Sequence, residues 1–214
     1  MNDSIFAKTV DVLEGLGFYN LSLTGGEPLL HPKYFDFVKF SKHRGFYVNS
    51  PTNGTLLTEK NVKRLKESGI DSVSVSIDSL DPEVADKVRL YPGQLHRALN
   101  GLKLLKKHGV PSSAIILLGK HNIHEYGGIV KKLDEDYDTP SIFCFPDAGV
   151  GPLDKIEFDR DELLKVIDEL LLLKKEGYRL LNATEYLLEL KRAYTSQKRR
   201  ITCYAGYYYV NVYW

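Results

Sequence analysis

Cysteine is scarce in this sequence, which has only Cys144 and Cys203 among its 214 residues. The two are far apart and form no CxxC pair, so the chain by itself holds neither a framework of disulfide bonds nor a complete cysteine-ligated metal site. Small disulfide-stabilised proteins are therefore excluded. The scarcity also bears on the motifs described below.

Long hydrophobic runs and an excess of charge of one sign are missing as well. No apolar run approaches the roughly 20 residues of a membrane-spanning helix, and the opening residues MNDSIFAKTV lack the basic and apolar segments of a secretion signal. The formal net charge is +1 without a long run of like charges, which disfavours nucleic acids and anionic membranes as partners. We expect a cytoplasmic protein that folds as one domain, or as one domain plus a fragment of another.

Strand-like and helix-like spacings of apolar residues alternate along nearly the whole chain. Strands are expected at 19–24, 46–50, 72–77, 113–118 and 141–145. Helices are expected at 4–16, 32–44, 58–68, 82–108 with an interruption near Pro92 and Gly93, 122–135 and 160–176. Asp159 and Glu162 have the spacing of a capping box at the start of the last helix. Strands separated by helices predict a parallel sheet with right-handed crossovers.

The stretch DSVSVSIDS, residues 71–79, indicates which parallel architecture this is. Val73, Val75 and Ile77 would point to one face of the strand, and the serines and Asp78 to the other. A central strand of a doubly wound sheet is apolar on both faces, whereas a polar inner face fits a complete or partial barrel. We predict an α/β fold, a partial (β/α)6-type TIM barrel, with its chemistry at the C-terminal ends of the strands.

The segment LTGGEPLLHP, residues 23–32, places Gly25, Gly26 and Glu27 directly after a predicted strand. Two glycines remove two side chains, so a ligand can lie against the bare backbone. The charge of Glu27 favours an ammonium group over a phosphate as that ligand. A tight turn without a ligand is the alternative.

Further polar candidates follow the later strands. Ser76 and Asp78 could bind the hydroxyl groups of a ribose, and Asn53 lies in the stretch PTNG after the preceding strand. Ordinary structural roles remain open: Asn53 as a turn former and Asp78 as the cap of the following turn. Asn122 with Glu125 has the spacing of a helix start.

Taken in order, LTGGEPLLHP, TNGTLL, VSVSIDSLDPEVADKVR, KKHGV and HNIHE resemble the radical S-adenosylmethionine (radical SAM) superfamily over roughly residues 1–145. The resemblance implies a partial barrel of six βα units, of which this chain lacks the first strand and its cluster loop. It implies that Gly25, Gly26 and Glu27 hold the amino group of the methionine moiety.

The resemblance also assigns roles to the later candidates. Ser76 and Asp78 match polar residues near the ribose and methionine moiety. Arg89, which would otherwise be read as a solvated charge, matches a basic residue near the carboxylate of the ligand. Asn122 matches the asparagine after the family's fifth strand.

The cofactors implied by the resemblance are S-adenosylmethionine and a [4Fe-4S] cluster, with an auxiliary iron–sulfur cluster in some members. One electron from the cluster cleaves a C–S bond of S-adenosylmethionine, and the resulting 5′-deoxyadenosyl radical takes hydrogen from a substrate. The implied partners are a peptide or small-molecule substrate, which includes cofactor precursors, and an electron donor such as ferredoxin or flavodoxin.

The sequence departs from the family in its cysteines. The family holds its cluster with three cysteines, usually CxxxCxxC, and no such motif occurs here. The barrel is expected over 1–200, and residues 201–214, ITCYAGYYYVNVYW, resemble the opening of a SPASM or twitch-type auxiliary cluster region in which Cys203 would be an iron ligand. A tyrosine-rich edge strand is the alternative. The chain is either part of a longer protein or a shortened relative without a cluster.

Three functional readings follow. The first is that the parent protein is a radical SAM enzyme that modifies a peptide or a small molecule, with this chain inactive alone. The second is a noncatalytic module that binds S-adenosylmethionine or a nucleotide. The third is a barrel lyase in which Lys120, after a strand end, forms a Schiff base, which requires an apolar pocket around the amine.

Overall fold

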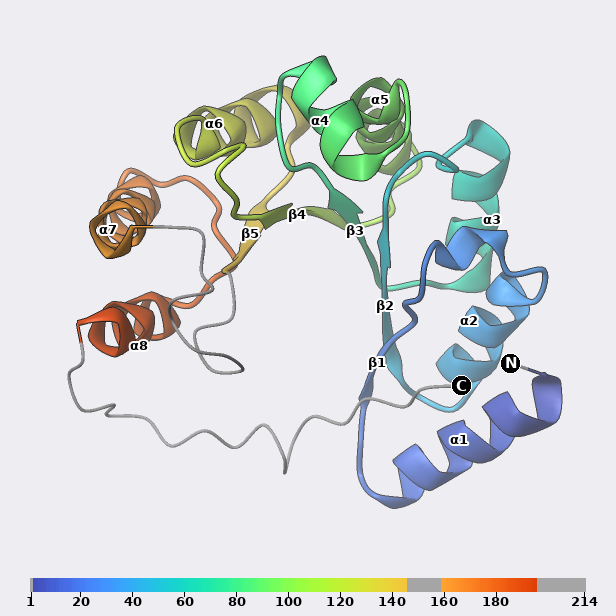
Figure 1. The fold of residues 1–214 in the computed structure, drawn as a ribbon. Coiled ribbons are helices and arrows are strands. Elements are labelled where there is room, and N and C mark those ends of the chain that lie inside the picture. Colours follow the sequence, from blue (N-terminus) through green and yellow to red (C-terminus); the bar gives the residue numbers. More distant parts are fainter. Residues whose placement is uncertain (1, 146–158, 196–214) are drawn as a thin grey trace.

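The computed structural model describes residues 2–145 and 159–195, and their backbone forms one curved sheet with helices on its outer face (Figure 1). The sheet has five parallel strands in the order β1-β2-β3-β4-β5. The strands are β1 (Asn20–Ser22), β2 (Tyr47–Thr52), β3 (Ser72–Ser76), β4 (Ser112–Leu117) and β5 (Ser141–Cys144). Strand order that follows chain order is typical of a barrel wall, so the predicted partial barrel is confirmed.

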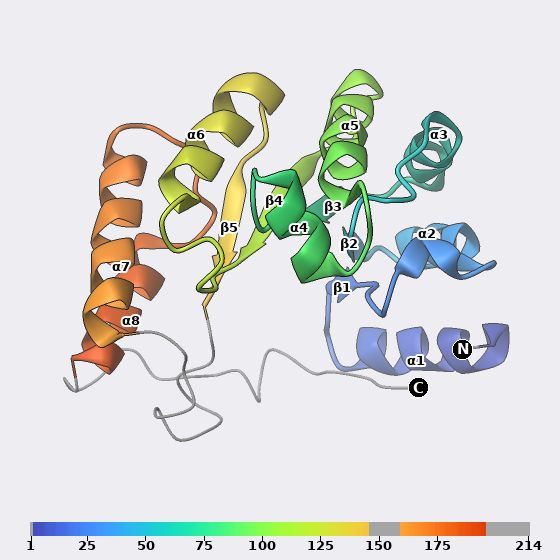
Figure 2. The same ribbon diagram turned by 45° about the horizontal axis from the view of Figure 1, so that its top comes forward.

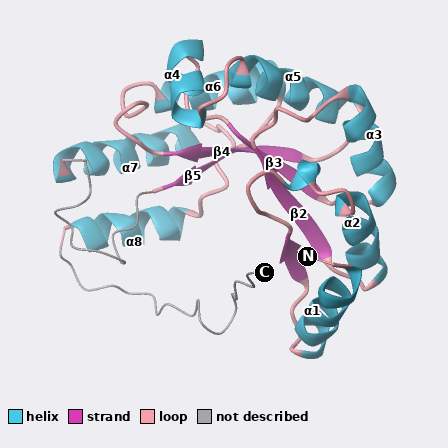
Figure 3. Cartoon of the chain, turned by 45° about the vertical axis from the view of Figure 1, so that its right-hand side comes forward, coloured by secondary structure: helices cyan, strands magenta, loops and turns pink. Residues whose placement is uncertain are grey.

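Helices lie between successive strands, before β1 and after β5, and cover the convex face of the sheet (Figures 1 and 3). They are α1 (Asp3–Gly15), the 3-10 turn η1 (Pro28–Leu30), α2 (Tyr34–His43), α3 (Glu59–Ser68), α4 (Pro82–Arg89), α5 (Gln94–Lys107), α6 (Tyr126–Tyr137), α7 (Arg160–Lys175) and α8 (Thr184–Tyr194). Within the ranges that the structure describes, none of these helices is both long and apolar enough to cross a membrane. Figure 2 shows α4 beside α5, near the ends of β3 and β4.

The alternation of side chains in β3 produces two different sheet faces. Val73 and Val75 are almost fully buried beneath the helices. On the concave face, Asn49 Nδ2 donates to Ser72 Oγ at 2.9 Å and to Ser74 Oγ at 3.0 Å. The hydroxyl oxygens of Ser74 and Ser113 are 3.0 Å apart. These side chains satisfy one another along the concave face, as the polar periodicity predicts for a barrel interior.

Several predicted helix boundaries are confirmed by their caps. Asp159 and Glu162 form the capping box of α7. The helical segment 82–108 is divided into α4 and α5 at Pro92 and Gly93, as expected. Asp81 accepts hydrogen bonds from the first amides of α4.

Two predicted helix starts are wrong. The helix expected from Pro32 begins at Tyr34, because residues 28–30 first form η1, which the Glu27 side chain caps. The helix expected from Asn122 begins at Tyr126, because residues 121–125 form consecutive turns. In both places, residues that the helical spacing includes belong instead to a loop at the C-terminal end of a strand.

The edge of the sheet beyond β5 was not predicted. Leu180 forms an isolated parallel bridge with Ser141, and Asn182 accepts from Phe143 N at 2.8 Å and donates to Phe143 O at 2.9 Å. Helix α8 follows directly, and Leu187 and Tyr194 bury its inner side. The expected division at residues 200 and 201 lies outside the described residues and stays a prediction.

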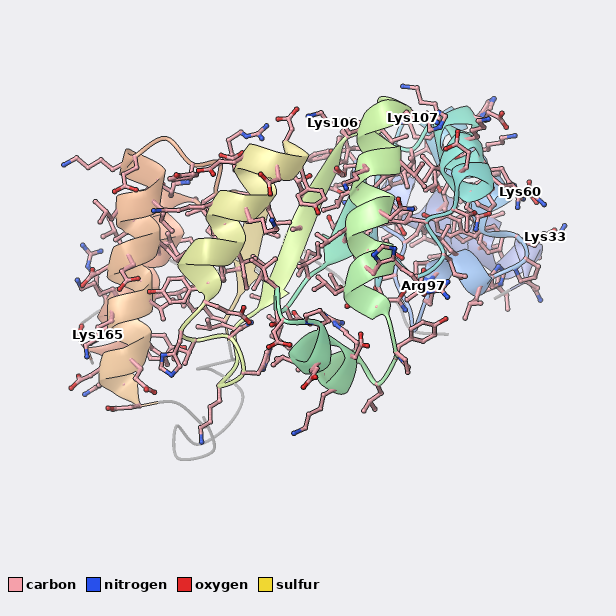
Figure 4. All side chains as sticks on the ribbon, turned by 90° about the horizontal axis from the view of Figure 1, so that it is seen from above. Lys33, Lys60, Arg97, Lys106, Lys107 and Lys165 are labelled. Atoms are coloured by element: carbon pink, nitrogen blue, oxygen red, sulfur yellow. The ribbon has the colours of Figure 1, made fainter. Side chains whose placement is uncertain are left out.

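Basic side chains gather on α3 and α5. The two helices carry eight lysine and arginine residues and two glutamates, and all eight basic side chains are exposed. Figure 4 labels four of them, Lys60, Arg97, Lys106 and Lys107. The net charge of +1 therefore conceals a locally basic outer surface.

Helix α7 gives a test of the core. Leu170 is fully buried and Leu172 is 53% exposed, in the same helix. We expect Leu170→Ala to lower the free energy of unfolding by about 2–5 kcal/mol, because it removes buried methyl groups and leaves a cavity. Leu172→Ala should change it by less than about 0.5 kcal/mol. Urea denaturation measures both, and similar losses for the two variants would contradict this packing.

Candidate functional site

The C-terminal ends of the parallel strands lie along one edge of the sheet, where the strand arrowheads end in Figure 3. The loop after β1 contains Gly25, Gly26 and Glu27, and Asn53 follows β2. Ser76 ends β3, and Asp78 comes just after it. The structure therefore brings these candidates, with Asn122 after β4, to one edge, which we call the mouth.

Gly25 and Gly26 are exposed, and a Cβ atom added to either would have no heavy atom within 4 Å. Neither glycine has a positive φ angle, so the backbone of this turn does not require glycine. Neither the backbone conformation nor close packing therefore requires glycine at positions 25 and 26. The absence of side chains at these two positions leaves the main chain open at the mouth.

Glu27 ties the glycine loop to the end of β2. One carboxylate oxygen accepts from Thr52 Oγ1 at 2.8 Å and from Leu29 N at 3.3 Å, and the other accepts from Asn53 N at 2.9 Å. All three donors are neutral, so the negative charge of Glu27 is not cancelled by them. Burial raises the pKa of nearby Tyr34 to about 12. A hydrogen bond with Ser50 lowers this pKa, and the negative charge of Glu27 raises it. Tyr34 is therefore a neutral neighbour of the carboxylate.

Asp78 and Arg89 form an ion pair beneath the mouth. Arg89 Nη2 lies 2.5 Å from Asp78 Oδ2, and the side chains are 29% and 1% exposed respectively. The contact is an ion pair without the alignment of a hydrogen bond, since Asp78 Oδ2 and Arg89 Nε have no hydrogen-bond partner among the described residues. Asp78 Oδ1 accepts from Leu117 N at 2.9 Å, so the carboxylate joins β4 and does not cap its own turn.

Asn122 is 1% exposed and its side chain is fully engaged. Its Oδ1 accepts from Gly119 N at 2.8 Å, and its Nδ2 donates to Asp78 O at 2.7 Å and Leu117 O at 2.9 Å. Asn122 thus joins the ends of β3 and β4. It does not cap α6, whose N-cap residue is Glu125.

Asn53 and Ser76 keep free polar groups at the mouth. Asn53 Oδ1 accepts from Thr55 N at 2.8 Å and from Thr55 Oγ1 at 2.6 Å. Over residues 2–145 and 159–195, no hydrogen bond is formed by Asn53 Nδ2 or Ser76 Oγ, and both residues are half-buried. A donor and a hydroxyl group are thus available to a ligand.

Gln94 was missed by the sequence reasoning. It is 1% exposed at the start of α5, and its Nε2 donates to Asn53 O at 2.7 Å and to Ser76 O at 3.1 Å. Glutamine after the dipeptide Pro92-Gly93 carries no motif that would mark it in a sequence. Only the folding of α5 against the strand ends brings it to the mouth.

The described residues offer little for metal binding. Within them, no group of three or more His, Cys, Asp or Glu side chains could hold a metal ion. Cys144 is exposed, and Cys203 lies outside the described residues. Lys120 is exposed as well, so it lacks the apolar pocket that a Schiff-base lysine needs.

The fold and the mouth together define a partial α/β barrel with open backbone and free polar groups at its C-terminal edge. The chain belongs to the radical SAM superfamily, whose family profile, described as "Radical SAM superfamily", matches residues 5–133. The resemblance noted in the sequence is thereby confirmed.

Two curated relatives illustrate the range of the similarity. An AdoMet-dependent heme synthase of Methanosarcina barkeri is 36% identical over 116 residues, which are 54% of this chain and 33% of that protein. A PqqA peptide cyclase of Ruegeria pomeroyi is 26% identical over 125 residues, 58% of this chain and 33% of that protein. The chain thus spans about a third of the length of these relatives.

Solved structures share the fold at low sequence identity. Streptococcus suis SuiB bound to the precursor peptide SuiA has a TM-score of 0.68 and 13% identity, over 86% of this chain and 44% of that chain. Native anSMEcpe with bound AdoMet has a TM-score of 0.65 and 17% identity, over 94% of this chain and 59% of that chain. These likenesses bear on the architecture alone.

The ion pair beneath the mouth can be tested by its effect on stability. We expect Asp78→Asn to lower the free energy of unfolding by about 1–3 kcal/mol, because it leaves the half-buried Arg89 without its counter-charge. Asp136→Asn, which breaks the exposed pair with Lys132 at 2.8 Å, should cost less than about 0.5 kcal/mol. Equal losses in chemical denaturation would show that the pair at the mouth acts like a surface pair.

Proposed function

We propose that the protein containing this chain is a radical SAM enzyme that modifies a peptide or a small molecule, such as a cofactor precursor. The proposal depends on one observation above all, the exposed backbone of Gly25 and Gly26 at the mouth. Family membership supports the same reading. An electron donor such as ferredoxin or flavodoxin is part of the proposal.

The first part of the proposed site binds the methionine end of S-adenosylmethionine. Gly25 and Gly26 allow its ammonium group to reach the main chain, and the negative charge of Glu27 attracts that group. The carboxylate of the ligand is assigned to Arg89, whose side chain is 29% exposed although its Nη2 contacts Asp78. Opposite charges on the protein thus match the two charged groups of the ligand.

The second part of the proposed site binds the nucleoside end. Ser76 Oγ and Asn53 Nδ2 are assigned to polar groups of the ribose and the base, because they have no partner among the described residues. Asp78 and Asn122 are 2% and 1% exposed, which is too little for a direct contact to be assigned to them. We assign them the positioning of Arg89 and of the ends of β3 and β4.

The described residues fit S-adenosylmethionine but do not fit the cluster, for which they offer no set of ligands. Cys203 as an auxiliary cluster ligand therefore stays a proposal for residues outside the described ranges. In the family, S-adenosylmethionine supplies the radical that removes hydrogen from the substrate. The contribution of the described residues is binding, orientation and charge.

The double glycine gives a direct test of ligand binding. We expect 214-residue chains with Gly26→Val to bind S-adenosylmethionine at least about tenfold more weakly than the unchanged chain, because the added side chain covers the open backbone. Gly15→Val is the control, since a Cβ atom at Gly15 also meets nothing within 4 Å but lies in α1. NMR titration measures binding, and thermal unfolding checks the fold. Equal binding by the two variants would contradict the assignment of the glycines.

Activity is tested on the longest product of the gene after anaerobic reconstitution with iron and sulfide. We expect bound iron, and conversion of S-adenosylmethionine to 5′-deoxyadenosine when a reductant is added. Binding of S-adenosylmethionine without iron would instead favour the noncatalytic module. The same assay without reductant is the control.

A further inference from the structure

The hydrogen bonds of Gln94 carry an inference beyond the assigned ligand contacts. The β2–β3 ladder ends with the pair Thr52 and Val75, so the carbonyl groups of Asn53 and Ser76 lie at or beyond its end. Gln94 Nε2 donates one hydrogen bond to each of them, at 2.7 and 3.1 Å. A single side chain from α5 thereby fixes the two residues that present free groups at the mouth.

The contact requires a side chain that can donate two hydrogens. Both partners are carbonyl oxygens, which only accept, and the NH2 group of glutamine has two hydrogens to give. The orientation of the amide is therefore fixed by its partners. An ionised carboxylate at this position would place its acceptor oxygens next to the two carbonyl oxygens, which also only accept. An apolar side chain would leave both carbonyl groups without a donor.

Gln94 is itself held in place from α4. The Asp86 carboxylate accepts hydrogen bonds from Gly93 N at 2.6 Å and from Gln94 N at 3.0 Å, and so satisfies two backbone amides at the start of α5. The backbone at Gly54 lies against α5, since a Cβ atom there would be 2.8 Å from Ala98 Cα. The helix and the loop after β2 are consequently in close contact.

Asn53 is the residue most constrained by this arrangement. Glu27 accepts its N–H, Gln94 donates to its carbonyl oxygen, and Thr55 donates to its Oδ1. Three neighbours thus fix Asn53, and its Nδ2 group is the only polar group of the residue without a partner among the described residues. A donor held this way loses little further freedom when a ligand binds.

We propose that Gln94 is a positioning residue of the S-adenosylmethionine site, which holds Asn53 Nδ2 and Ser76 Oγ toward the ligand through their backbone carbonyls. This inference rests on the proposed function of the mouth. It adds a buried residue of α5 that has no place in the sequence motifs. Its role differs from that of a residue that only stabilises the fold.

A matched control separates positioning from stability. Asn182 is also a buried amide, 6% exposed, and it also fixes a strand backbone, through Phe143 N and O. It lies at the β5 edge of the sheet, whereas the assigned contacts belong to the loops and ends of β1 to β3 and to α4. We expect Gln94→Leu and Asn182→Leu both to lower the melting temperature.

Binding is then measured by NMR titration of S-adenosylmethionine into the 214-residue chain, with the side-chain amide signals of Asn53 as a reporter. In the unchanged chain these signals should move on binding. Gln94→Leu should displace them before ligand is added and weaken binding by about ten- to a hundredfold, since small misplacements are costly. Asn182→Leu should leave the dissociation constant and the Asn53 signals unchanged.

A second variant keeps the test valid if Gln94→Leu does not fold. Gln94→Glu has the same shape, and burial should raise the pKa of the new carboxyl group. When protonated it can donate one hydrogen bond, and when ionised it donates none. Binding by Gln94→Glu should therefore be weaker at pH 8 than at pH 5.5, with less change in the unchanged chain.

The outcomes are distinguishable. Absence of S-adenosylmethionine binding by both the unchanged chain and the longest reconstituted gene product would count against the proposed function itself. Normal binding and unmoved Asn53 signals in Gln94→Leu, or equal losses in Gln94→Leu and Asn182→Leu, would overturn only the role of Gln94. Weakened binding in the Gln94 variants alone, with the pH dependence of Gln94→Glu, supports it.

Discussion

The arrangement of the mouth depends on one constraint: backbone groups at the ends of parallel strands lie beyond the hydrogen-bond ladder and need other partners. In this chain, side chains supply many of them. Glu27 accepts a hydrogen bond from the Asn53 amide after β2. Gln94 donates to carbonyl groups just after β2 and at the end of β3, and Asn122 donates to carbonyl groups just after β3 and at the end of β4. Side-chain hydrogen bonds thus join each strand end to the next one, and they hold the loops that follow the strands in place.

A consequence is that the polar residues of the mouth divide into two groups. Asp78 and Asn122 are buried and contact the protein itself: Asp78 accepts from Leu117 N and pairs with Arg89, and Asn122 joins the ends of β3 and β4. Gly25 and Gly26 leave open backbone at the mouth, and Asn53 Nδ2 and Ser76 Oγ have no protein partner in the described ranges. A ligand that carries both charges and hydroxyl groups would need such a rigid inner group behind the outer one, because free polar groups on a mobile edge lose binding energy to ordering.

Much of the fold could be predicted from the sequence. The alternation of valine with serine in β3 indicated a barrel wall, and the capping box of Asp159 and Glu162 and the break at Pro92 marked helix boundaries correctly. Helix α8 was missed although Leu187, Leu190 and Tyr194 have helical spacing. The starts of α2 and α6 were misplaced because the side chains of Glu27 and Asn122 form hydrogen bonds in the loops that precede these helices. The spacing of apolar residues along a helix carries no information about such contacts.

The sequence by itself determined the order of strands and helices, the polar inner face and the presence of two glycines and a carboxylate after the first strand. Periodicity and local turn chemistry act over a few residues, so they can be read without a structure. Only the tertiary structure decided that Asp78 pairs with Arg89, that Asn122 is buried, and that Gln94 reaches two strand ends. Those contacts join residues many positions apart, and their geometry exists only after the helices have packed against the sheet.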